Sequence, residues 1–397
     1  MRLKSHRESR RKLHRNPHRK PYKNRRRFGF AVFCVAFIII MLTAAGVAEP
    51  LFEDMGEEDI ADIDIGAMSD NMDDGMDDGS GARIVITCGG DTTLGCTAAQ
   101  RKMKNGFDAV VAENGYSWAF SGISDILAQD DMTLVNFEGT LTESGGTKDK
   151  LYNFKGPAEY VNMLTFGSVE AVNIANNHIL DYGRQGKDDT IRALEEAGIL
   201  VSGEGMPAVY EVNGVKIGLI GNTFPYNNAR RDISRDVKKL REQGCRIIIA
   251  SFHWGSEYDV KYTQEQRKIG RAAINAGADI VIGHHPHVVQ GIELYKGKYI
   301  LYSLGNLVFG GNTSPDDRDA YMARLTFRVS GDAAEAARPD SSDSSLVSLE
   351  MIPIRTTSLA KGTDYRPVVA EGTDGERIRD RVLRLSANVD EIRIYGQ

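Results

Sequence analysis

The stretch Ala278-Asp-Ile-Val-Ile-Gly-His-His-Pro-His287 joins a short apolar run to three histidines. An apolar run of this length predicts a buried β-strand, and the apolar runs before His178 and His253 end in the same way. Open α/β sheets gather their chemistry at the carboxyl ends of their strands. We therefore expect these histidines to meet at one edge of a sheet.

Two acidic residues occupy comparable positions. Asp91 follows the apolar run that begins at Arg83, and Glu138 follows Met132–Phe137. Imidazole and carboxylate together are typical ligands of divalent zinc, manganese or iron. The sequence therefore predicts a site for one or two such ions, whereas the other three histidines lie in a basic tail.

The order of the predicted elements indicates a layered α/β fold. From Arg83 to Ile282, apolar strands alternate with segments of helical periodicity, among them 117–129. After residue 288 we expect strands, a polar loop at 332–345 and a closing helix at 377–385. Alternation of this kind predicts a layered α/β core.

Local signals mark several boundaries within that order. Asn213-Gly214 and Lys296-Gly297 predict hairpin turns, and a Thr-Gln-Glu-Gln capping box predicts a helix that begins after Thr263. The cysteines are unevenly spaced, so no disulfide framework is implied, although a single Cys88–Cys96 bridge stays open.

The first eighty residues predict a membrane anchor rather than a globular domain. Residues 1–27 form a basic tail, with thirteen Lys or Arg against one acid. Residues 28–48 are uncharged and apolar over a length that spans a bilayer core. Residues 49–81 form an acidic, disordered linker, which leaves residues 82–397 as the folded domain.

This charge pattern also predicts a topology. Basic residues before an apolar span favour a cytoplasmic N-terminus and an extracytoplasmic body, so we expect a single-pass protein of the cell membrane. Gly46-Val47-Ala48 resembles a cleavage site, which keeps a removed signal peptide as the alternative. The body mixes Lys and Arg with acidic residues throughout, which excludes a nucleic-acid surface.

Six short motifs follow one another along the body, and together they carry a family resemblance. They are Gly-Asp-Thr-Thr-Leu-Gly (90–95), Asn-Phe-Glu-Gly-Thr-Leu (136–141), Asn-Asn-His-Ile-Leu-Asp-Tyr-Gly (176–183), Phe-His-Trp-Gly-Ser-Glu-Tyr (252–258), His-Pro-His-Val-Val-Gln (285–290) and Tyr-Ser-Leu-Gly-Asn (302–306). This series resembles the CapA-type poly-gamma-glutamate capsule proteins, a branch of the calcineurin-like metallophosphoesterase fold. The resemblance covers roughly residues 83–310.

The resemblance implies roles for particular residues. It implies six metal ligands, which are Asp91, Glu138, Asn177, His253, His285 and His287. It implies that His178 stabilises a transition state or protonates a leaving group. Three further residues are expected to line the substrate pocket or orient ligands, and these are Asn136, Glu257 and Asn306. His284 is expected to be a neighbour of the site rather than a ligand.

The geometry of the last ligand pair can be predicted from its spacing. His285 and His287 stand two residues apart, so an extended backbone would place both imidazoles on one face. Pro286 between them restricts the backbone and would stiffen the pair.

One departure from the family pattern leaves two functions open. The usual first motif is Asp-x-His, but Thr93 stands at the histidine position, and Glu138 replaces an aspartate. The first hypothesis is a metal-dependent hydrolase that acts on a phosphoester or an exported polymer. The second is a non-catalytic assembly or export factor that binds anionic poly-gamma-glutamate. Either protein would work with the membrane and with other capsule-synthesis membrane proteins.

Overall fold

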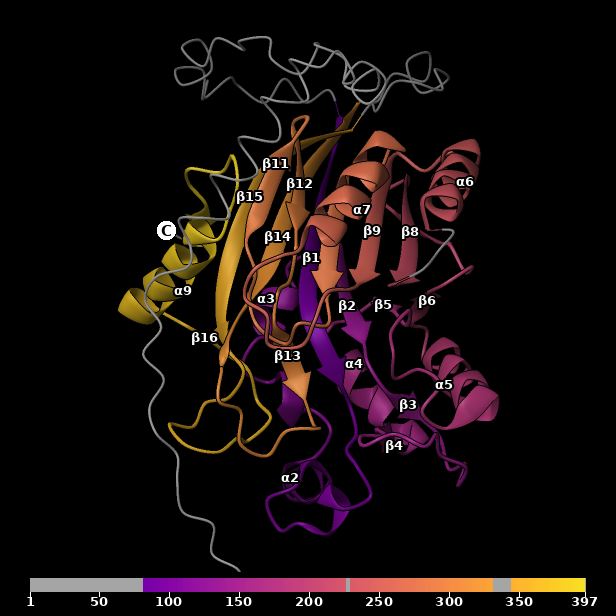
Figure 1. Cartoon of the computed structure of the whole chain (residues 1–397), viewed down its shortest axis with the longest axis vertical. Helices are drawn as coiled ribbons and strands as arrows, with labels where there is room; N and C mark the ends of the chain where they lie inside the picture. The colour runs from indigo at the N-terminus through magenta and orange to yellow at the C-terminus, as the bar shows by residue number, and fades with distance from the viewer. Residues whose placement is uncertain (1–80, 226–228, 331–343, 397) are drawn as a thin grey trace, which may run out of the picture. The chain divides into compact units, whose positions relative to one another are not determined.

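Two large β-sheets pack face to face in the part of the chain that this computed structural model describes, residues 81–396 without 226–228 and 331–343 (Figure 1). The first sheet has the order β16-β15-β14-β1-β2-β5-β6, and β13 and β17 pair with β1 and β15. The second has the order β11-β12-β10-β9-β8-β7. The predicted layered α/β architecture is thus confirmed, with sheets that mix parallel and antiparallel strands.

The strands of the first sheet are β1 (Gly81–Thr93), β2 (Met132–Phe137), β5 (Ala171–Asn173), β6 (Leu200–Ser202), β13 (Asn306–Phe309), β14 (Asp319–Ser330), β15 (Ser344–Arg355), β16 (Val368–Val369) and β17 (Arg393–Ile394). Those of the second are β7 (Ala208–Val212), β8 (Val215–Thr223), β9 (Ile247–His253), β10 (Ile280–His284), β11 (Ile292–Tyr295) and β12 (Lys298–Leu301). A small separate ladder joins β3 (Thr140–Leu141) to β4 (Lys155–Gly156).

The helices are α2 (Phe107–Asn114), α3 (Ser124–Leu127), α4 (Asn162–Phe166), α5 (Gly183–Glu196), α6 (Ala229–Glu242), α7 (Gln264–Asn275) and α9 (Gly372–Arg384), with short 3₁₀ turns η2 (Gln100–Lys102), η3 (Trp118–Phe120) and η4 (Ala158–Val161). α6 and α7 contact the second sheet through β8 and β10, whereas α5 and α9 contact strands of the first sheet.

The central strands of both sheets run in the same direction, which decides where the site lies. β1, β2, β5 and β6 are parallel neighbours in the first sheet, and β8, β9 and β10 are parallel neighbours in the second. The arrows of both sets point toward the same edge in Figure 1. Chain segments that leave the two sheets therefore meet at this edge.

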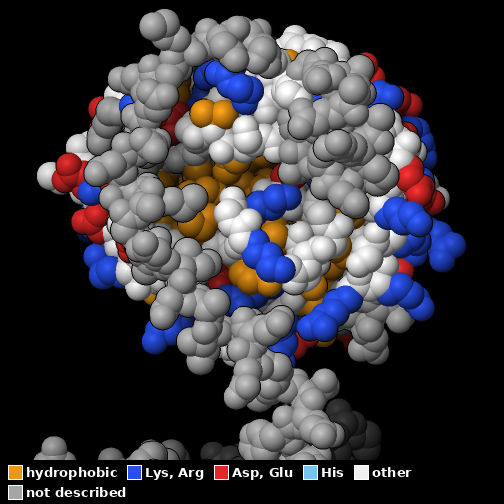
Figure 2. Space-filling model, turned by 90° about the horizontal axis from the view of Figure 1, so that it is seen from above, with side chains coloured by type: hydrophobic (Ala, Val, Ile, Leu, Met, Phe, Trp, Pro, Cys, Tyr) orange, Lys and Arg blue, Asp and Glu red, His pale blue; other side chains and the backbone are white. Residues whose placement is uncertain are grey.

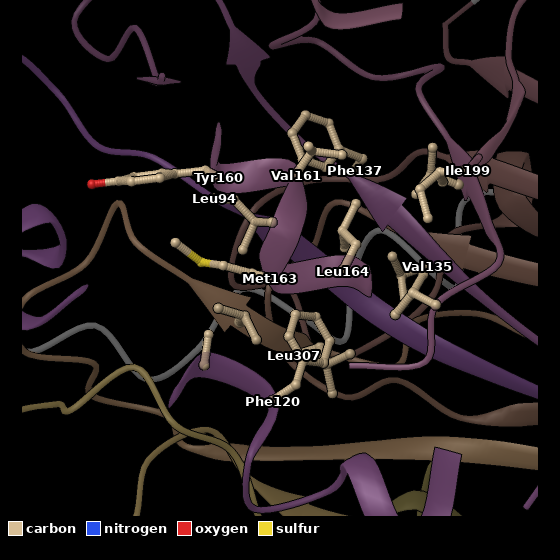
Figure 3. Packing of buried hydrophobic residues seen from close by; sticks show 14 of the residues in the cluster. Leu94, Phe120, Val135, Phe137, Tyr160, Val161, Met163, Leu164, Ile199 and Leu307 are labelled. Carbon is tan, nitrogen blue, oxygen red and sulfur yellow. The ribbon is translucent and has the colours of Figure 1, made fainter. Parts of the chain in front are cut away.

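Apolar side chains fill the space between the sheets and the space on their outer faces. Ile86 of β1 and Ile282 of β10 belong to the core between the sheets. On the outer face of the first sheet, Met163 and Leu164 of α4 lie close to Phe120 and Leu307 (Figure 3). Burial of these apolar side chains stabilises the fold by roughly 25 cal/mol per Å² of apolar surface removed from water.

The opposite edge of the sheets has a different surface. Figure 2 shows the end from which β1 starts, and its described surface carries hydrophobic side chains in the middle with Lys and Arg around them. No histidine is visible among the described atoms of this face. The histidines of the body lie at the carboxyl ends of the strands, on the other side.

Several predicted boundaries are confirmed by backbone geometry. The turn residues Asn213-Gly214 and Lys296-Gly297 all have positive φ, as a tight hairpin between twisted strands requires. The capping box that precedes α7 has both of its reciprocal hydrogen bonds, between Thr263 and Gln266. Cys88 and Cys96 are free thiols, so the open disulfide alternative is wrong.

One expectation needs correction, and several others lie outside the described residues. The helix expected over 117–129 is only η3 and the single turn α3, because the chain bends between them. Among the described residues, no helix has the length and hydrophobicity needed to cross a bilayer. The expected tail at 1–27, span at 28–48, linker at 49–81 and most of the loop at 332–345 lie outside the residues described.

Candidate metal centre

Four strand ends deliver the central side chains. Asp91 lies near the end of β1, and Glu138 directly follows β2 in the same sheet. His253 and His284 end β9 and β10 and are paired in register with each other. All four side chains are essentially excluded from solvent, so this centre is built inside the protein.

Two groups of potential ligands share one carboxylate. Glu138, His285 and His287 have ligand atoms within 4.8 Å of one another, and so do Asp91, Glu138 and His253. Both carboxylate oxygens of Glu138 are buried and have no hydrogen-bond partner in the described structure. Burial of an unpaired carboxylate costs several kcal/mol, and a bound cation would remove that cost. The residues present therefore fit one divalent ion, or two bridged by Glu138.

The pKa values of the two carboxyl groups diverge in this environment. Burial raises the pKa of Glu138 well above its ordinary value; the imidazole of His287 opposes this effect and the carboxylate of Asp91 adds to it. Burial also acts to raise the pKa of Asp91, but the hydrogen bond and charge of His287 outweigh it and the net pKa is lowered. Asp91 is thus held as an anion, whereas Glu138 lacks an adequate counter-charge.

The pKa values of the imidazoles of His253 and His287 also diverge. Burial, together with the nearby His285, lowers the pKa of His253 well below its usual range. Burial alone would lower the pKa of His287, but Glu138 and Asp91 raise it to about 10. A neutral imidazole is the form that binds a metal, so His253 already has it. A cation held by Glu138 and Asp91 would take the place of this proton, because a ligating imidazole is neutral.

Asn177, which the resemblance implies as a ligand, lies beside this ligand set. Its Oδ1 lies 3.0 Å from Nε2 of His253, and the same Nε2 lies 3.6 Å from Oε1 of Glu138. An amide oxygen, a carboxylate oxygen and an imidazole nitrogen thus converge on one point. Such a mixed oxygen and nitrogen set suits zinc, manganese or iron.

The backbone of the His-Pro-His segment differs from the prediction. His285 has φ of 97° and His287 has φ of 58°, so neither residue is extended. The two imidazoles still face one centre, with ring centroids 6.0 Å apart, because each residue turns the chain in the left-handed region. The N–H of His285 donates to Oδ2 of Asp91 at 3.2 Å. Non-glycine residues held in this region cost about 1–3 kcal/mol and cluster at functional sites.

Amide side chains hold the ligands in place. Asn136 is buried, and its Nδ2 donates to Oδ1 of Asp91 at 2.8 Å and lies 3.4 Å from Nδ1 of His253. Asn136 therefore supports Asp91 and His253, not Glu138 as its proximity in sequence suggests. Asn306 does the same for His287, since its Oδ1 lies 2.9 Å from Nδ1 of that ring. Support of this kind fixes the orientation of each ligand.

His178 lies at the border of the centre and is oriented by a carboxylate. Its Nδ1 lies 2.7 Å from Oδ2 of Asp181, and its Nε2 lies 3.8 Å from Oε1 of Glu138. Burial lowers the pKa of His178, and Asp181 opposes that effect. The ring of Phe154 packs 4.5 Å from the imidazole, centroid to centroid. Nε2 is the nitrogen that faces the centre.

Three residues of this arrangement were not identified from the sequence. Asp181 is the buried partner of His178, and Lys150 approaches both, with Nζ 2.5 Å from Oδ1 of Asp181 and 3.1 Å from Nδ1 of His178. Asn173 donates from Nδ2 to Oδ1 of Asn136 at 3.2 Å. Asp181 could have been found, because it stands three residues after His178 within the same motif. No local signal marks Lys150, which comes from an irregular segment.

The remaining candidates lie around the centre. His284 is buried with Nδ1 3.7 Å from Oδ1 of Asp91, and it belongs to neither ligand group. Thr93, at the position of the missing histidine, is buried and its hydroxyl has no hydrogen-bond partner in the described structure. Glu257 is exposed at the rim, close enough for its charge to contribute to the raised pKa of Glu138.

Comparisons with known proteins identify the family of this chain. The model of the bacterial capsule synthesis protein PGA_cap family matches residues 85–311, which include every candidate ligand. Capsule biosynthesis protein CapA of Bacillus anthracis is 31% identical over 330 residues, which cover 74% of each chain. PGA biosynthesis protein CapA of Bacillus subtilis (strain 168) is 28% identical over 299 residues, 70% of this chain and 77% of that one.

A solved structure of a hypothetical protein from Thermus thermophilus aligns over 68% of this chain and 98% of that chain, with a TM-score of 0.43 and 14% identity. The family match spans more than half of the sequence, and the Bacillus anthracis relative exceeds 30% identity over most of it. On these grounds the chain belongs to the bacterial capsule synthesis protein PGA_cap family.

Proposed function

We propose that this protein serves the synthesis or export of a poly-gamma-glutamate capsule through a metal-dependent, hydrolase-like centre outside the cell membrane. Family membership and the names of its relatives support the capsule role. The buried groups of His, Asp and Glu support the metal. The partners in this proposal are the anionic polymer, the membrane and other membrane proteins of capsule synthesis.

The observation that carries the metal-dependent part is the state of Glu138. It is fully buried between two ligand groups, and neither of its oxygens has a partner in the described structure. Asp91, Asn177 and His253 would hold an ion on one side of Glu138, and His285 and His287 would hold an ion on the other. An ion held there would supply Lewis-acid polarisation of a substrate oxygen.

The chain itself supplies the groups that move protons. When Nδ1 of His178 carries the proton, it donates a hydrogen bond to Asp181. Nε2 is then free to exchange a proton with the substrate. Burial behind Phe154 and the lowered pKa of His178 favour the neutral ring at rest. His178 is thus oriented for general acid–base catalysis at Nε2.

The second candidate is a non-catalytic assembly or export factor. Thr93 favours it, because a hydroxyl replaces the histidine that completes the first motif of hydrolytic members of this fold. Such a factor would keep the metal and the fold and would bind the polymer without turnover. The two candidates therefore differ in hydrolysis and agree in metal binding.

Hydrolysis and metal content, measured together, test the proposal. Purified protein should contain a divalent transition metal and should hydrolyse a phosphoester or a gamma-linked glutamate polymer. Asp91→Ala combined with His285→Ala should lose the metal, while Asp125→Ala, at an exposed acid of α3 outside both ligand groups, serves as the control. Equal metal content in the wild type and the double variant would contradict the metal centre. Metal without hydrolysis of either substrate would favour the assembly factor.

The membrane topology is tested separately. The proposal places the basic tail in the cytoplasm and residues 82–397 outside, because thirteen Lys or Arg precede an uncharged span. Protease added to intact cells should degrade the body and spare the tail. A body that stays protected until lysis would reverse the proposed orientation.

A further inference from the structure

A cavity of about 400 Å³ lies beside the metal centre. One wall is formed by His287 and Asn306, which are a candidate ligand and the residue that orients it. Tyr258, in the segment after β9, and Asp316, in the segment before β14, also line it. A molecule bound in this cavity would thus reach the metal centre directly.

An aromatic ring is held at the mouth of the cavity. Tyr258 is 66% exposed, although its main-chain N–H donates to the carbonyl of Pro286 at 2.8 Å. Its ring centroid lies 6.4 Å from that of His287. The hydrogen bond to Pro286 fixes the backbone of Tyr258 against the segment that carries His285 and His287. A large exposed ring in such a fixed position is available to a bound molecule.

The charges around this ring are negative and uncompensated. Glu257 and Asp316 are exposed, and in the described part of the chain neither forms an ion pair or a hydrogen bond through its side chain. Burial raises the pKa of Tyr258, and the carboxylates of Glu257 and Asp316 add to the effect, which places both within electrostatic range of the ring. By contrast, Asp317 is already paired with Arg381 at 2.6 Å.

Lys and Arg are absent from the described lining of the cavity. Lys150, which reaches the centre, lies against His178 and Asp181 rather than in this cavity. Among the described lining residues, His287 can carry a positive charge on the side of the metal centre, whereas Asp316 and the neighbouring Glu257 make the surroundings of Tyr258 negative. An ammonium group would meet the face of an aromatic ring flanked by carboxylates, which is the environment that stabilises such cations.

We propose that this cavity binds a primary ammonium group, and that the substrate of the centre is the amino end of a poly-gamma-glutamate chain. This inference rests on the proposed function. Each internal residue of such a polymer carries a free carboxylate and no positive charge, so an internal segment offers no group that the acidic surroundings of Tyr258 would attract. The amino end is the one place where the polymer offers a cation. The protein would thus act on chain ends and not within chains.

The test compares two probes that differ only at that end. Full-length protein loaded with Mn²⁺ is titrated calorimetrically with a gamma-linked glutamate pentamer that has a free amino end, and with its N-acetylated counterpart. We expect the free-amine pentamer to bind about tenfold more tightly, from a cation–π contact together with two flanking charges. Acetylation removes the positive charge and leaves the free α-carboxylates in place.

Variants assign this preference to the cavity. Glu257→Gln combined with Asp316→Asn should reduce the preference to within about twofold, while Glu211→Gln, at an exposed acid on the edge strand β7, should leave it unchanged. Tyr258→Leu should also weaken the preference, whereas Tyr258→Phe, which keeps the ring, should retain it. Metal content of each variant shows whether the centre is intact.

Equal binding of the two pentamers by the wild type would overturn the proposal, and so would failure to bind either one. A full tenfold preference in the Glu257→Gln, Asp316→Asn variant would overturn it as well. The binding preference does not require turnover, so a missing hydrolytic activity contradicts the hydrolase function alone. A free-amine preference that depends on Tyr258 and the two carboxylates supports the cavity in either case.

Discussion

Glu138 and Glu293 are both buried glutamates in this protein, but they differ in whether the chain provides hydrogen-bond donors for their carboxylates. Glu293, on β11, accepts hydrogen bonds from Arg267, Arg271 and the hydroxyl of Tyr302. Burial alone would raise its pKa, but these donors lower it. Glu138 receives no side-chain donor from the described residues, and its pKa is raised by burial. Where a buried acid is structural, the chain supplies its own cations, so Glu138 is left for a cation from outside.

The strongest test of this comparison removes the unpaired acid. Glu138→Gln should lower bound metal more than about tenfold, because both ligand groups lose their shared carboxylate. The metal-free variant should be at least as stable as metal-free wild type, since a buried carboxylate without partners is removed. Elemental analysis and thermal unfolding in chelator measure the two effects. Undiminished metal in Glu138→Gln would show that Glu138 is not a ligand.

A second test separates catalysis from metal binding at the same centre. His178→Asn should reduce hydrolysis by roughly 10²–10⁴-fold, the usual contribution of general acid–base catalysis. Metal content should stay near normal, because Asn177 and not His178 contributes to the ligand set. Steady-state rates and elemental analysis on one preparation decide the point. Unchanged hydrolysis in this variant would show that His178 is not the general acid or base, and full polymer production despite lost hydrolysis would favour the assembly factor.

For Glu293, the comparison predicts that loss of the negative charge lowers the stability of the protein. Glu293→Gln should destabilise the metal-free protein by about 2 kcal/mol, because Arg267 and Arg271 lose their counter-charge. The value is below that of a fully buried pair, since the side chains of both arginines are 33% exposed. Metal content should be unchanged. Denaturant unfolding of both proteins gives the difference, and the same midpoint for both would remove the contrast with Glu138.

Asp130 offers a smaller test of how burial acts on an acid that lies away from the centre. Burial raises its pKa to about 7, although the hydroxyl of Thr133 donates to it at 2.8 Å. The folded protein therefore holds a proton that the unfolded chain releases above about pH 4, and ionisation of Asp130 lowers stability as the pH rises from about 4 to about 7. Asp130→Asn should thus stabilise the protein by about 1–2 kcal/mol at pH 8 and by little at pH 4.

Unfolding midpoints across this pH range measure the effect of Asp130→Asn. Asp125→Asn, at an exposed acid of α3, is the control and should change stability little at any pH. A stabilisation by Asp130→Asn that is equal at pH 4 and pH 8 would mean that packing, and not charge, is responsible.

The sequence predicted the parts of this site that depend on strand ends. Asp91, Glu138, His253 and His285 follow apolar runs whose period indicates strands, and parallel strands bring such residues to one edge. The sequence did not predict the antiparallel pairing of β14 with β1, because contacts between residues so far apart along the chain leave no local pattern. Lys150 was missed for the same reason.

The backbone of His285 and His287 was predicted wrongly for a different reason. Spacing and Pro286 indicated an extended segment, but both residues adopt positive φ. This conformation is unfavourable for histidine by itself, and tertiary contacts such as the hydrogen bond from His285 to Asp91 support it. Strain held in place by distant residues cannot be predicted from the residues that bear it.

The candidate ligands are divided evenly between the two sheets. Asp91, Glu138 and Asn177 come from the first sheet and its loops, and His253, His285 and His287 come from the second. A metal bound by both sets would act as a cross-link between the sheets, comparable to a disulfide that closes a long loop. Unfolding of either sheet would then release the ion, and chelation should lower the melting temperature of the entire body. The metal centre would thus be part of the structural framework of the protein as well as its site of action.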